Sequence, residues 1–122
     1  MKFASIRLAT HDVDRLVAFY ERLSGATAAR PAPGFAELRL AGATLAISAQ
    51  QLIDQYNAGA AVAASNRSAI LEFEVDDVDA VFARMADAAE VVLPPTVMPW
   101  GNRAALLRDP DGSPVNVFSR PR

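Results

Sequence analysis

Two carboxylates, Glu72 and Glu74, stand two positions apart in a stretch that alternates polar and apolar residues. On a β-strand this spacing projects both side chains to one face, where they could hold a cation or act as a general base. The chain has one histidine, His11, and no cysteine, which excludes disulfides, thiolate nucleophiles and zinc fingers. No Ser, His and Asp constellation is evident, because the single histidine lies in a turn.

The overall composition excludes further classes of function. The chain has 122 residues, 52% of them apolar, with 12 basic and 14 acidic side chains. This length is typical of one domain with one core, and the scattered basic residues give no reason to expect nucleic-acid binding. The longest uncharged stretch, 40–53, is too short to span a membrane, and 1–12 lacks the apolar run of a signal peptide. We expect a cytoplasmic domain that contacts neither nucleic acid nor membrane.

The first half of the chain predicts a βαβββ order of elements. Alternating apolar residues indicate strands, and apolar residues at helical spacing between Asp12, a suitable cap, and Gly25 indicate a helix. The predicted strands of this half are 3–10, 26–30, 35–40 and 44–48.

The opening pattern returns 65 residues later. The matching pairs are Ala4 and Ala69, Asp12 and Asp77, Val13 and Val78, Asp14 and Asp79, and Ala18 and Ala83. Towards the end of each half the offset drifts to 70, where Gly42 matches Gly112. The chain is therefore predicted to be a single domain, 1–122, made of two similar modules at about 1–49 and 69–122.

The segment between the modules, 50–68, is rich in alanine and has no clear periodic apolar face. It is interpreted as a connector with at most one helical turn. Alternatively it is a mobile flap over a ligand site, since long loops in compact domains are often functional.

The whole pattern resembles a known superfamily. An Asp-Val-Asp begins each predicted helix, and Arg108-Asp109-Pro110-Asp111-Gly112, a tight turn, precedes the last predicted strand. With the two βαβββ copies, these motifs resemble the vicinal oxygen chelate superfamily over 3–119; its members include glyoxalase I, bleomycin-resistance proteins, fosfomycin-resistance enzymes and extradiol dioxygenases. The resemblance implies an α+β fold with a curved, cup-shaped mixed sheet, helices on its outer face, and a homodimer. Whether one chain or two chains form each cup is left open.

Alternation then assigns side chains to the two faces of the strands. Residues expected to face the helices and build the core are Ile6, Leu8, Leu71, Phe73, Val115 and Val117. Ligand-binding residues expected in or around the cup are Phe3, Ser5, Arg7, Ala46, Ser48, Ile70, Glu72, Glu74, Trp100, Asn116 and Phe118.

The resemblance also locates the positions where metal-dependent members hold a divalent ion, usually through His, Glu or Gln. These positions carry Ser5, Ala46, Ile70 and Asn116. Divalent ions of this kind need carboxylate oxygens or imidazole nitrogens, whereas these side chains offer at best two neutral oxygens. We therefore expect no metal and no other cofactor.

Two residues have competing interpretations. Glu72 and Arg7 occupy equivalent positions in the two modules and could form an ion pair, or Glu72 could bind a ligand or, with Glu74, a metal. Trp100 stands in a turn flanked by Pro99 and Gly101, where it could pack as a plug or form an aromatic wall for a planar ligand.

Three functions follow as hypotheses. The favoured one is a metal-independent protein of the bleomycin-resistance kind, not an enzyme, that sequesters an aromatic or antibiotic-like small molecule in the cup. The alternative is a glyoxalase or dioxygenase type of lyase or oxidoreductase that binds a metal through non-standard ligands. The third is an interaction domain with a vestigial cup.

Overall fold

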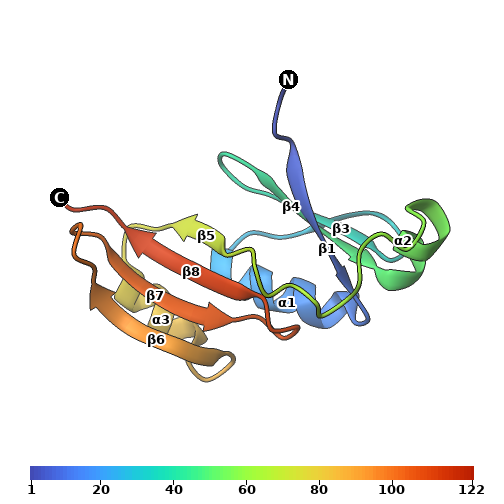
Figure 1. Cartoon of the computed structure of the whole chain (residues 1–122). Helices are drawn as coiled ribbons and strands as arrows, with labels where there is room; N and C mark the ends of the chain where they lie inside the picture. Colours follow the sequence, from blue (N-terminus) through green and yellow to red (C-terminus); the bar gives the residue numbers. More distant parts are fainter. The chain divides into compact units, whose positions relative to one another are not determined.

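Two four-stranded mixed sheets, one in each half of the chain, form the framework of the protein (Figure 1). The computed structural model describes residues 1–122, which divide into unit 1, Met1–Ser65, and unit 2, Asn66–Arg122. Unit 1 contains β1 (Ser5–Thr10), α1 (Val13–Ser24), β2 (Ala29–Ala32), β3 (Phe35–Arg39), β4 (Thr44–Ala49) and α2 (Gln50–Tyr56). Unit 2 contains β5 (Leu71–Glu74), α3 (Val78–Met85), β6 (Glu90–Val97), β7 (Arg103–Arg108) and β8 (Pro114–Ser119). The predicted α+β class and tandem βαβββ order are confirmed.

Both sheets have the same topology. The strand order is β1-β4-β3-β2 in unit 1 and β5-β8-β7-β6 in unit 2. In each case the first strand of the module pairs in parallel with the last, and the other pairs are antiparallel. The internal repeat read from the sequence is thus a repeat of structure, because equivalent strands take equivalent places in the two sheets.

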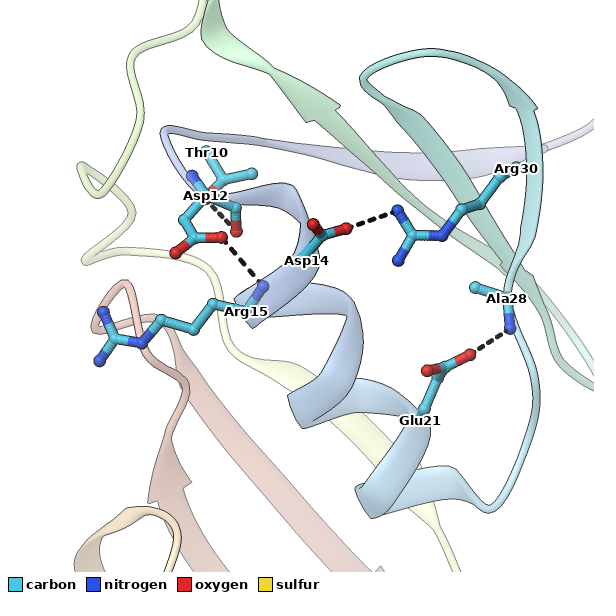
Figure 2. A network of polar contacts seen from close by, with 7 residues as sticks. All are labelled: Thr10, Asp12, Asp14, Arg15, Glu21, Ala28 and Arg30. Atoms are coloured by element: carbon cyan, nitrogen blue, oxygen red, sulfur yellow. Dashed lines mark hydrogen bonds and ion pairs between the residues drawn. The ribbon is translucent and has the colours of Figure 1, made fainter.

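Helix α1 begins and ends where its flanking residues predict. Figure 2 shows Asp12, whose Oδ1 accepts a hydrogen bond of 3.1 Å from the backbone N–H of Arg15 and so caps the helix. At the other end Gly25 adopts φ +73° and donates its N–H to the carbonyl of Glu21, a left-handed cap that favours glycine. The Glu21 side chain also accepts the N–H of Ala28 at 2.8 Å, which fixes the chain on its way to β2.

Helix α3 begins in the same way. Asp77 Oδ1 accepts a hydrogen bond of 3.0 Å from the N–H of Ala80. The helix packs against β6, β7 and β8 with Val78, Val81 and Met85 buried. The two Asp caps are the predicted starts of both helices, and they set the direction in which each helix crosses its sheet.

The predicted core is correct for unit 2 and partly wrong for unit 1. Leu71, Val115 and Val117 are buried as expected, and Phe73 is half-buried. Ile6, however, is 40% exposed, whereas Leu71, at the equivalent place on the edge strand β5, is buried. Exposure falls along this face of β1, because Leu8 is half-buried and Thr10 is buried.

The segment 50–68 is more ordered than its composition indicates. Its first residues form α2, and the side chain of Gln50 joins three points: its Nε2 donates to Asp54 Oδ1 at 3.0 Å and to the Ala61 carbonyl at 2.8 Å. Its Oε1 accepts the N–H of Ala63, a buried residue. The boundary between the two units, at Ser65 and Asn66, falls within this segment. None of the helices is long and apolar enough to cross a membrane.

Candidate functional site

The face of the unit 1 sheet opposite α1 carries most of the candidate residues of that unit. Strand register places Ser5 beside Thr44, Arg7 beside Ala46 and Ala9 beside Ser48. Ala46 and Ser48 have small side chains that are buried, at 3% and 1% exposure. Arg7, Ser5 and Phe3 are exposed, and they present the polar and aromatic groups on this side.

Arg7 is held by a residue that sequence reasoning missed. Its Nη2 donates a hydrogen bond of 2.9 Å to Oδ1 of Asn57, the C-terminal cap of α2. Asn57 donates its own N–H to the carbonyl of Ile53, which is buried. The next residue, Ala58, has φ +53°, a backbone conformation that alanine rarely adopts. Arg7 and Asn57 are 50 positions apart, so no local pattern in the sequence points to their contact.

Three residues of β3 belong to the same face, and two of them, Glu37 and Arg39, were not predicted. Phe35 lies beside Ser48, Glu37 beside Ala46, and Arg39 beside Thr44. Glu37 and Arg39 form an ion pair of 3.3 Å. Their alternation with the buried Ala36 and Leu38 could have revealed them, because it places Phe35, Glu37 and Arg39 on the opposite face.

The corresponding face of unit 2 joins four of the predicted residues into one patch. Strand register sets Glu72 beside Asn116 and Glu74 beside Phe118. Asn116 Nδ2 donates to Glu72 Oε2 at 3.0 Å, and Glu74 forms an ion pair of 3.3 Å with Arg120. The Arg120 guanidinium also lies 5.5 Å from the centre of the Phe118 ring, within the range of a cation–π contact.

The remaining predicted residues are separate from these contacts. Trp100 is 70% exposed, so the interpretation of this residue as a buried plug is wrong. Ile70 precedes β5 and is 54% exposed. Arg7 and Glu72 each have a partner within their own unit, and an ion pair between them stays a prediction because it would join the two units.

The two residues whose side-chain pKa is shifted, Asp79 and Arg103, lie away from both faces. The Arg103 guanidinium, mainly through hydrogen bonds, lowers the pKa of the Asp79 carboxyl, and Asp79 in turn raises the pKa of Arg103. Asp79 lies in the first turn of α3 and Arg103 at the start of β7. This pair ties a helix to its sheet and supplies no proton donor or acceptor to the candidate site.

Comparison with known proteins identifies the family of this chain. The model of the glyoxalase/bleomycin resistance protein/dioxygenase superfamily matches residues 2–117. The chain belongs to this superfamily. No curated protein matches it.

Several solved structures share the fold of this chain. A glyoxalase/bleomycin resistance protein/dioxygenase from Nocardioides is 27% identical, with a TM-score of 0.79 over 100% of this chain and 85% of that chain. A protein of unknown function from Agrobacterium tumefaciens is 28% identical, with a TM-score of 0.82 over 98% and 94%. A glyoxalase-related enzyme from Fulvimarina pelagi has a TM-score of 0.85 over 98% and 88%, and at 22% identity it shows the likeness of fold alone.

The side chains at the four superfamily metal positions do not fit a divalent ion. Ser5 carries a hydroxyl, Ala46 a buried methyl group and Ile70 a hydrocarbon chain. Asn116 carries an amide whose nitrogen is bonded to Glu72. No group of three or more His, Cys, Asp or Glu side chains is arranged to hold a metal ion, and His11 lies exposed in the turn after β1.

Proposed function

We propose that this chain is a metal-independent binding protein of its superfamily, which sequesters an aromatic or antibiotic-like small molecule on the faces of its sheets. The observation that carries the proposal is the set of side chains at the four metal positions, Ser5, Ala46, Ile70 and Asn116. Together they offer two neutral oxygen-bearing groups and no charge. A site of this kind lacks the carboxylate or imidazole ligands that metal-assisted catalysis requires.

The polar groups near these positions support binding rather than metal coordination. Glu72 accepts a hydrogen bond from Asn116, and Glu74 pairs with Arg120, so both carboxylates already have partners of their own. Small-molecule sites typically combine apolar or aromatic surface with a few placed polar groups. The half-buried Phe118 and the amide of Asn116 provide this combination on the unit 2 sheet.

A homodimer is part of the proposal. Two-fold dimers are the commonest oligomers, and two apolar side chains at one sheet edge are exposed: Phe3, just before β1, at 73% and Ile6, on β1, at 40%. Light scattering after gel filtration would measure a mass twice that of the 13.0 kDa chain. A mass of one chain at micromolar concentration would contradict this part of the proposal and leave ligand binding untouched.

The function is tested by screening aromatic natural products and antibiotics for thermal stabilisation and by native mass spectrometry, with and without EDTA. A ligand present at about 100 times its Kd stabilises the folded protein by about 2.7 kcal/mol, and EDTA should not change this. Asn116→Ala should weaken binding, while Asn102→Ala, which removes an amide from the turn before β7, should not. The proposal fails if no compound binds, or if binding or turnover appears only when a divalent metal is added.

A further inference from the structure

Arg7 has a different kind of partner from five other arginines of the chain. Five arginines form ion pairs with a carboxylate: Arg30, Arg39, Arg103, Arg108 and Arg120. Arg7 instead donates to the neutral amide oxygen of Asn57. An amide oxygen orients a guanidinium but leaves its positive charge in place, so Arg7 is positioned without being neutralised.

The neighbours of Arg7 on the sheet have short side chains. Its neighbours along the same face of β1 are Ser5 and Ala9, and its partner on β4 is Ala46. All three have short side chains, and the Arg7 side chain is exposed. The acidic residue on the far side of Ala46, Glu37, is paired with Arg39. On the sheet, therefore, no bulky side chain and no unpaired carboxylate stands next to Arg7.

The residue that orients Arg7 is itself fixed. Asn57 closes α2 through its backbone N–H, and Gly59 donates to the same Ile53 carbonyl at 3.1 Å. Gln50 holds the following loop at Ala61 and Ala63. Because Asn57 is held in place, it limits the rotamers of Arg7. A guanidinium whose orientation is already fixed loses less entropy when it binds a ligand.

These observations define the chemistry of a ligand. A guanidinium has five N–H donors in a planar fork, and one of them is used by Asn57. The others match the two oxygens of a carboxylate, which arginine binds through two parallel hydrogen bonds. An aromatic ring of the same sheet face comes from Phe35, which lies beside Ser48 and is half-buried.

We infer that Arg7 is the anion-binding residue of the unit 1 sheet face and that it binds the carboxylate of an aromatic carboxylic acid. The inference rests on the proposed function and names the class of ligand. Asn57 is a positioning residue that acts through Arg7.

The test uses two matched probe pairs, 3-phenylpropionate with 3-phenylpropionamide and 2-naphthoate with 2-naphthamide. Titrations of the full chain are followed by NMR, including the Nε–H signal of Arg7. Each carboxylate should bind at least about tenfold more tightly than its amide, since a hydrogen bond to a charged group is worth about that factor or more. The Arg7 Nε–H signal should shift only with the carboxylates.

Variants distinguish the effect of the Arg7 charge from the effect of its positioning by Asn57. Arg7→Gln should remove the preference for carboxylates, Arg7→Lys should keep part of it, and Asn57→Ala should weaken carboxylate binding less than Arg7→Gln does. Arg30→Gln, which makes the same change in net charge on β2, should leave both affinities unchanged. Circular dichroism at each titration temperature confirms that every variant is folded.

The outcomes are distinct. If amides and carboxylates bind equally and Arg7→Gln has no effect, the inference is wrong and the proposed function stands. If compounds bind neither here nor in the broader screen, both fail. If Arg7→Gln and Glu72→Gln lower stability in a coupled way without changing carboxylate binding, Arg7 serves a structural ion pair instead, and the inference is again overturned.

Discussion

The carboxylate of Asp79 and the guanidinium of Arg103 meet through two hydrogen bonds, Nη2 to Oδ1 at 2.7 Å and Nε to Oδ2 at 2.8 Å. Asp14, the matching residue of the first module, pairs with Arg30 at 2.9 Å (Figure 2). The partner of Asp14 comes from β2, whereas the partner of Asp79 comes from β7, which is equivalent to β3. In both modules an aspartate in the first turn of the helix therefore pairs with an arginine, but the two arginines come from strands that are not equivalent.

The Asp79 pair predicts a pH dependence of stability. Because Arg103 lowers the pKa of Asp79 in the folded state below its usual value of 3.8, the pair contributes stability that is fully present above that value. This contribution is lost as the pH falls through the lowered pKa. A double-mutant cycle with Asp79→Asn and Arg103→Gln, measured by urea unfolding, should show a favourable coupling at pH 7 that declines below about pH 4. A coupling that is unchanged at pH 2 would contradict this prediction.

Replacing Ile6 and Ile47 by alanine should lower the free energy of unfolding by different amounts. Ile47 is 0% exposed in β4, whereas Ile6 is 40% exposed in β1. Ile47→Ala should lower the free energy of unfolding by about 2–5 kcal/mol, and Ile6→Ala by about 1 kcal/mol or less. Chemical denaturation of both variants measures the difference. Measured at a concentration at which the chain is monomeric, equal losses would contradict this prediction.

Gln50 and Gln51 form a matched pair for testing the order of the loop after α2. Gln50→Ala removes the bonds to Asp54, Ala61 and Ala63 and should cost about 1–3 kcal/mol, because the N–H of buried Ala63 loses its acceptor. Gln51 is exposed, so Gln51→Ala should have almost no effect. Hydrogen exchange should show faster exchange at Ala63 only in the Gln50 variant. Unchanged protection there would contradict the role of Gln50.

We expect that removing divalent metal ions with a chelator will not lower the stability of the protein. Because Ser5, Ala46, Ile70 and Asn116 lack ligand groups suited to a divalent ion, dialysis against EDTA should leave the melting temperature unchanged. Elemental analysis of protein purified without chelator should find no stoichiometric zinc, nickel, manganese or iron. A fall in melting temperature that is restored by one of these metals would contradict the prediction.

Local patterns in the sequence predicted the elements that depend on neighbouring residues. Asp12 and Asp77 cap their helices, and Gly25 ends the first one, because capping involves groups only a few positions apart. The internal repeat predicted the order of helices and strands along the chain for the same reason, because each module carries its own helix and strand patterns.

Contacts between distant residues were not predictable in this way. The bond from Arg7 to Asn57 depends on how α2 returns over β1, and α2 lies in a segment without a periodic apolar face. The different burial of Ile6 and Leu71, which occupy equivalent places in the two sheets, is not encoded by the alternation that the two strands share. The candidate faces could be predicted from alternation, but the partners of their charged residues could not.

The parallel pairing of the first and last strands in each module has a consequence for synthesis of the chain. Ser5 pairs with Thr44, so β1 leaves the ribosome well before its hydrogen-bonding partner exists. At about 5–20 residues per second, an unpaired β1 waits several seconds for β4. During that interval Ile6 of β1 and the preceding Phe3 are available to chaperones or to other nascent chains. The unit 1 sheet can close only when translation has passed Ala49.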